Sequence, residues 1–101
     1  MTTVGYLRAA QADVRRAARF YAKESRTLAA EFVLEVDRSA ARLVEYPEVG
    51  VPTRRGARKL LRRRFPYLMI YRVDPERVVI LAVGHQRRHP DFWLSRANQS
   101  S

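Results

Sequence analysis

The sequence contains no cysteine, which excludes disulfide bonds and thiolate metal sites. No apolar run approaches the roughly 18 residues that a membrane-spanning helix needs, and the first residues do not form an apolar signal segment. Lysine is also scarce, because only Lys23 and Lys59 accompany the arginines among the 20 basic residues. We therefore expect a cytoplasmic protein that has no membrane partner, and we expect neither a metal nor a cofactor.

Acidic residues are scarce in the second half of the chain. Residues 51–101 carry 12 basic and 3 acidic side chains, whereas residues 1–50 carry 8 and 7, so the halves contribute +9 and +1 to the net charge of +10. The length of 101 residues predicts one domain, residues 1–101, and 47% hydrophobic residues are enough for a core. The asymmetry predicts an acidic partner that docks mainly on the C-terminal half.

The basic residues concentrate between Arg54 and Arg64, where seven of eleven residues are cationic and none is acidic. This run leads directly into the aromatic and aliphatic segment 65–71, which is typical of a strand. A folded surface should therefore display the run, and a fixed basic surface suits an anionic partner. The alternative is that these arginines are solvated, or pair with Glu31, Glu35 and Glu45 of the helices.

Hydrophobic periodicity predicts the other elements. Residues 4–7 suggest a short strand, a period of 3.6 predicts one helix from Ala10 to about Glu24, and a second helix ends before Pro47. Strands follow around 58–64, 67–73 and 78–83, the last apolar throughout and so expected to be central. The order βααβββ, followed by a short C-terminal tail, indicates an α+β domain with a helical hairpin packed on a twisted, mainly antiparallel sheet.

These elements, in this order, resemble the RelE/ParE superfamily of toxins from bacterial type II toxin–antitoxin systems. Three groups of residues carry the resemblance: Ala12 to Val14, Phe20 and Tyr21 in the first helix; Ala30, Phe32, Leu43, Pro47 and Gly50 in and after the second; and the segments 64–71, 79–85 and 87–93. The resemblance covers nearly the whole chain. It is closer to ParE-like members, some of which serve plasmid stabilisation.

The resemblance implies a toxin that a cognate antitoxin neutralises through a partly acidic C-terminal segment. ParE-like members inhibit DNA gyrase by binding it, without catalytic residues. RelE-like members bind the ribosome and cleave mRNA as metal-independent endoribonucleases. A third alternative is a non-toxic solitary member. Since both activities share the fold, the residues must distinguish them.

RNA cleavage needs a proton acceptor, a cation for the charged phosphate and a proton donor. In RelE, as the resemblance implies, an arginine and a tyrosine follow the last strand, but the corresponding positions hold Gln86 and Phe92. The strict RelE site is therefore absent, which favours the gyrase hypothesis. If the protein is a ribonuclease, the candidate catalytic residues are Arg58, Arg64, His85 and Arg88. His85 would be the proton carrier, and the alternative, which we favour, is that it caps the end of the strand through hydrogen bonds.

For contacts with a partner we expect the basic run, the arginines after the last strand and the aromatic pair of the tail: Arg54, Arg55, Arg58, Arg62, Arg64, Arg87, Arg88, Phe92 and Trp93. Phe92 and Trp93 have an alternative role, in which they close the edge of the sheet. We assign Phe20, Phe32 and Tyr46 to packing in the core or the helical hairpin.

Overall fold

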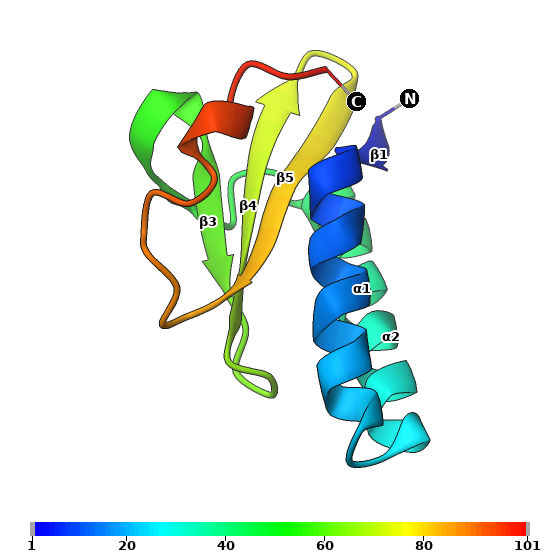
Figure 1. Ribbon diagram of the computed structural model, residues 1–101. Coiled ribbons are helices and arrows are strands. Elements are labelled where there is room, and N and C mark those ends of the chain that lie inside the picture. The colour runs from blue at the N-terminus through cyan, green and yellow to red at the C-terminus, as the bar shows by residue number, and fades with distance from the viewer. Residues whose placement is uncertain (1, 101) are drawn as a thin grey trace.

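The computed structural model describes residues 2–100. It has two layers, of which one is a five-stranded mixed sheet and the other is a pair of helices. The elements in chain order are β1 (Thr3–Tyr6), α1 (Arg8–Ala22), α2 (Arg26–Glu45), β2 (Val51–Pro52), the 3-10 turn η1 (Arg54–Gly56), β3 (Arg58–Leu61), β4 (Tyr67–Asp74), β5 (Arg77–His85) and the 3-10 turn η2 (Leu94–Arg96). The two helices lie side by side next to the sheet, and the C-terminal segment crosses in front of it (Figure 1). The predicted α+β fold is confirmed.

The sheet has the order β1-β5-β4-β3-β2, with β5 near its centre, as its apolar sequence predicts. β1 pairs in parallel with β5, Thr3 opposite Arg77 and Tyr6 opposite Ile80, whereas the other pairs are antiparallel. A bulge places one extra residue, Leu81, in β5 between the partners of Ile70 and Tyr71. Because β1 ends opposite Ile80, the remainder of β5 has no strand on that side.

Local sequence explains the helical hairpin. Ser25 caps α2, and its Oγ accepts a hydrogen bond from the backbone N–H of Leu28 at 3.2 Å. The apolar stripes of the two helices bury Ala10, Ala17, Phe32 and Leu43. The prediction of core packing holds for Phe32 and is wrong for Phe20 and Tyr46, which are 60% and 56% exposed.

The C-terminal segment covers the face of the sheet that the helices leave free. Tyr67 contacts Tyr21 and Phe32 of the helices, so Leu68 and its partner Gly84 face the other way. Phe92 packs on Gly84 so closely that a Cβ there would overlap its ring. Trp93 is 2% exposed and belongs to the core cluster. The tail therefore closes the core.

Candidate functional site

The basic run after α2 is largely paired with other groups. Arg62 forms an ion pair with Glu35 at 2.6 Å, Arg64 pairs with Glu31, and Arg54 pairs with Asp91 at 2.8 Å. The sequence left open whether the run is a solvated surface or pairs with glutamates of the helices. The structure shows such ion pairs for Glu31 and Glu35. In residues 2–100, the cations of the run without an ion pair or side-chain hydrogen bond are Arg55, Lys59 and Arg63, all exposed.

Arg58 holds the loop between α2 and β2. Its guanidinium donates hydrogen bonds to the carbonyl oxygens of Gly50 at 2.8 Å and Glu48 at 3.3 Å. The neighbouring Tyr71 hydroxyl donates to the Pro47 carbonyl at 2.7 Å and accepts from the Gly50 N–H at 2.9 Å. Burial raises the pKa of Tyr71, although the Gly50 N–H and the Arg58 charge act in the opposite direction. Tyr71 therefore keeps its proton at neutral pH and anchors the loop.

Replacing Tyr71 with phenylalanine should lower the free energy of unfolding by about 1–3 kcal/mol, because the buried Gly50 N–H then loses its acceptor. Urea unfolding followed by circular dichroism measures this. The matched control is Tyr6→Phe, since the Tyr6 hydroxyl binds the exposed Asp37 at 3.3 Å and its loss should cost less than about 1 kcal/mol. Equal losses in the two variants would contradict the assignment of Tyr71 as an anchor.

A cavity of about 420 Å³ lies between α1 and the end of β5. It is lined by Asp13, Arg16, Ala17, Phe20, Tyr67, Val83, Gly84, His85 and Arg88. His85 accepts a hydrogen bond at Nδ1 from the backbone N–H of Arg87 at 3.0 Å, so in the neutral ring the proton is on Nε2. The rings of His85 and Tyr67 also pack edge to face, with their centroids 5.5 Å apart. Of the candidate catalytic residues, the cavity brings together His85 and Arg88.

The other two candidate catalytic residues do not line this cavity. Arg58 lies opposite Tyr71 and His85 opposite Tyr67, so they are separated by four residues along β4, about 13 Å of strand, with the strand itself between them. Arg64 is engaged by Glu31 and lies over the Phe65 ring at 5.3 Å. The four residues do not form one catalytic cluster.

The two positions at which the resemblance leads us to expect an arginine and a tyrosine hold Gln86 and Phe92. The Gln86 side chain donates to the Arg62 carbonyl at 3.4 Å, and Phe92 packs between Gly84 and the guanidiniums of Arg88 and Arg96, at 4.1 and 5.6 Å from its ring centre. Neither side chain can transfer a proton. His89, the remaining histidine, is exposed and accepts at Nδ1 from the Asp91 N–H at 3.1 Å.

The remaining predicted partner residues differ in accessibility. Arg87 is exposed, and Arg55 is both exposed and the one non-glycine residue with a positive φ, 56°, among residues 2–100. That backbone conformation is uncommon for arginine and turns its side chain outward at η1. Phe92 is half-buried, whereas the buried Trp93 already uses its surface in the core.

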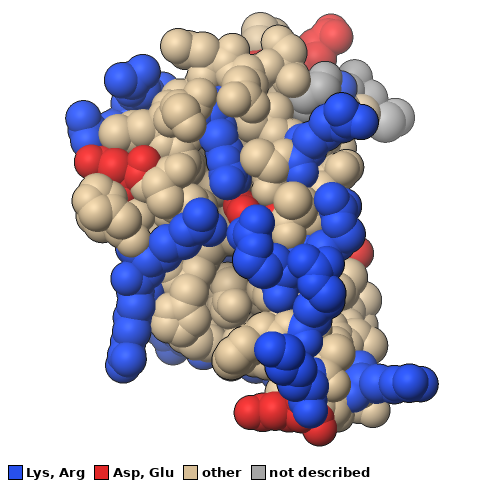
Figure 2. Space-filling model, viewed as in Figure 1, with Lys and Arg blue, Asp and Glu red and all other residues tan. Residues whose placement is uncertain are grey.

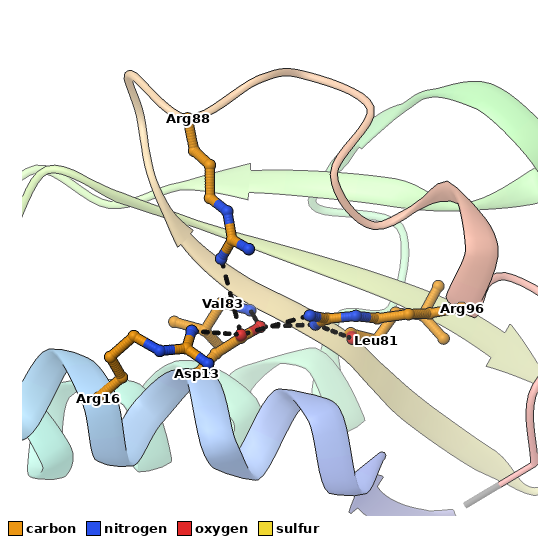
Figure 3. A network of polar contacts seen from close by, with 6 residues as sticks. All are labelled: Asp13, Arg16, Leu81, Val83, Arg88 and Arg96. Carbon is orange, nitrogen blue, oxygen red and sulfur yellow. Dashed lines mark hydrogen bonds and ion pairs between the residues drawn. The ribbon is translucent and has the colours of Figure 1, made fainter.

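Sequence reasoning missed the polar centre of the site, which is Asp13. Its carboxylate is 1% exposed and accepts from the backbone N–H of Val83 at 3.0 Å and from Arg96 Nη1 at 2.6 Å. Arg16 and Arg88 approach the other oxygen at 3.3 and 3.8 Å (Figure 3). Arg96 also donates to the Leu81 carbonyl at 3.1 Å. The Asp13–Arg96 pair thus satisfies the backbone groups of β5 that β1 leaves unpaired.

A signal for Asp13 was present in the sequence. Ala10, Asp13 and Ala17 follow the spacing i, i+3, i+7, so an acidic residue stands in the apolar stripe of α1. A charged residue on a buried face needs a partner of opposite charge. The sequence could have indicated that a partner exists, but not that it is Arg96, 83 residues away.

Residues 2–100 contain no group of three His, Cys, Asp or Glu side chains that could hold a metal ion. None of the helices in that range is long and apolar enough to cross a membrane.

Comparison with known proteins gives concordant results. Residues 4–90 match the family described as the ParE toxin of the type II toxin–antitoxin system, parDE. A chain of the chromosomal ParDE system from P. aeruginosa superposes with a TM-score of 0.76 at 22% identity, over 84% of this chain and 96% of that one. A chain of the RelBE2 toxin–antitoxin complex from Mycobacterium tuberculosis superposes with a TM-score of 0.59 at 28% identity, over 83% and 90%.

No curated protein sequence matches the chain. The family match nevertheless covers most of its length, including both helices and, apart from Thr3 of β1, all five strands, and the two structures support the same fold. The chain therefore belongs to the ParE toxin family of type II toxin–antitoxin systems.

Proposed function

We propose that the protein is a toxin that inhibits DNA gyrase by binding it, and that a cognate antitoxin with a partly acidic C-terminal segment neutralises it. The observation that carries the proposal is the composition of the segment that follows β5. Gln86 and Phe92 stand where RNA cleavage would need a cation and a proton donor, and Phe92 is packed between Gly84 and Arg88. A binding mechanism needs no such groups.

The surplus of basic residues supports the antitoxin partner. Arg55, Lys59 and Arg63 remain exposed after the ion pairs of the run have formed, and the chain as a whole carries +10. An acidic segment would gain charge-assisted contacts there. Association should therefore weaken as salt is added.

The purified protein should inhibit supercoiling of plasmid DNA by gyrase and leave mRNA intact in a translating ribosome mixture. Expression in a bacterial host should give filamentation and DNA-damage signalling, whereas cleavage of mRNA would give rapid translation arrest. Inhibition of neither process would contradict the toxin assignment and favour a non-toxic family member.

Ribosome-dependent cleavage of mRNA is a second candidate, because His85 and Arg88 share a cavity with Arg16. The discriminating variant is His85→Ala, with His89→Ala as the matched control at an exposed position. We expect both variants to keep full toxicity. A loss of toxicity of 100-fold or more in His85→Ala alone, in the range expected for a general acid or base, would favour the ribonuclease.

A further inference from the structure

The outer face of α1 carries a line of cations, although the first half of the sequence, residues 1–50, is close to neutral in net charge. Arg8, Arg15 and Arg19 lie within about 20° of one line along the helix at 100° per residue, and Lys23, the C-cap, lies about 40° further round from Arg19. We name these four residues the α1 ridge. All four are exposed, on the side opposite the buried Ala10, Asp13 and Ala17. Figure 2 shows basic side chains in a column over the part of the surface where α1 lies.

The ridge has no acidic partner. In residues 2–100, none of its four side chains forms an ion pair or a side-chain hydrogen bond, whereas Glu31 and Glu35 of α2 pair with Arg64 and Arg62 of the basic run. The one acid within α1, Asp13, is buried on the opposite face and bound to Arg96. The near-neutral charge of residues 1–50 is therefore the sum of a basic helix, α1, and a slightly acidic helix, α2.

Helix stability explains only part of this arrangement: the helix dipole favours Arg19 in the last turn of α1 and Lys23 at its C-cap, but not Arg8 and Arg15. Arg15 and Arg19, and Arg19 and Lys23, are like-charge pairs at i,i+4, each of which disfavours a helix. Arg8 is the first residue of α1, where the helix dipole favours an acid, and the first turn contains none. Residues that break local rules on an exposed face point to a ligand.

The chemistry of the ridge identifies that ligand. Between its cations the exposed residues are Gln11 and Ala22, whereas the exposed aromatic residue of α1, Phe20, lies about 100° round the helix from Arg19, on the flank that carries Arg16. The side chains on the line of the ridge are therefore mainly cationic, which suits contact with the phosphate backbone. From Arg8 to Lys23 the ridge spans about 22 Å, the axial length of about six base pairs. Arg16 and Arg88 extend the positive surface on the cavity side.

We propose that the α1 ridge binds the phosphate backbone of duplex DNA. This binding can be measured without gyrase, since it needs only the outer face of one helix. It would place the protein on the DNA on which its proposed target acts.

The test is fluorescence anisotropy with a labelled 20-base-pair DNA duplex, in the absence of gyrase, at salt concentrations from 50 to 200 mM. The variant Arg15→Gln/Arg19→Gln should bind the duplex about 10-fold or more weakly than the unchanged protein at 50 mM salt. The slope of log affinity against log salt concentration should fall by about two, one for each phosphate contact that is lost. Its melting temperature should equal or exceed that of the unchanged protein, because repulsion in α1 is relieved.

The matched control is Lys59→Gln/Arg63→Gln, which removes the same two charges from exposed positions off the ridge. It should lose less than about 3-fold in DNA affinity. Equal losses in the two double variants would mean that only net charge matters, and would overturn the proposal. It would also be overturned if the ridge variant lost binding to a glutamate-rich peptide or single-stranded RNA while still binding the duplex. Because the probe contains no gyrase, this result is independent of the supercoiling assay.

Discussion

Replacing Asp13 with alanine is expected to lower the free energy of unfolding by about 3–5 kcal/mol, the range for removing one partner of a buried ion pair. The variant would leave Arg96, 14% exposed, without its counter-ion and the Val83 N–H without its acceptor. Arg16 and Arg88 would then face Arg96 with no negative charge between them. A domain of this size has a total stability of about 5–15 kcal/mol, so the loss is a large part of it.

Urea unfolding of the variant and of Asp37→Ala measures the effect. Asp37 is the matched control because it is an exposed helical aspartate whose one side-chain hydrogen bond, among residues 2–100, is with the Tyr6 hydroxyl. Its replacement should cost less than about 1 kcal/mol. A double-mutant cycle with Arg96→Ala should give a coupling energy above about 1 kcal/mol. A cost for Asp13→Ala no greater than that of the control would refute the structural role of the carboxylate.

Replacing Trp93 with alanine is expected to lower the free energy of unfolding by about 3–5 kcal/mol. The reason is that its side chain, on the C-terminal tail, is 2% exposed and is part of the core. The tail is also held by Arg72, whose Nη1 donates to the carbonyl oxygens of Ala97 at 2.7 Å and Gln99 at 3.0 Å. Thermal or urea unfolding monitors the loss. If Trp93 instead lay on a peripheral extension, its removal would hardly change stability.

Phe20→Ala is the matched control for Trp93→Ala, since it also truncates a large aromatic side chain. Phe20 is 60% exposed, and its loss should change the free energy of unfolding by about 0.5 kcal/mol or less. A similar cost for the two variants would show that the tail contributes no more than a surface residue. In that event Phe92 and Trp93 would be available for contact with a partner.

The basic run and the α1 ridge lead to different expectations about partners. The run contributes three cations to ion pairs and one to backbone carbonyls, so it stabilises the fold as well as carrying charge. The exposed pairs among these are individually weak. Within residues 2–100 the side chains of the ridge form no ion pair or hydrogen bond. A partner that recognises charge alone therefore has more to gain from α1 than from the segment that is most basic in sequence.

Much of the fold was predictable from local patterns. The period of 3.6 in both helices, the apolar segment of β5 and the turn at Asp74-Pro75-Glu76 each depend on neighbouring residues. β2, with two residues, is too short to produce a pattern, and β3 ends at Leu61 rather than 64. The parallel pairing of β1 with β5 joins segments more than 70 residues apart, which no local period can encode.

The sequence by itself determined the class of fold, the family, the excess of arginine and the presence of Gln86 and Phe92 where the resemblance leads us to expect an arginine and a tyrosine. These depend on residue identity, order and short spacing. Only the tertiary structure decided which charges are neutralised. It buried Asp13 against Arg96, paired Arg62 and Arg64 with α2 and left the α1 ridge free. The physical reason is that electrostatic interaction depends on distance in space, which is unrelated to separation along the chain.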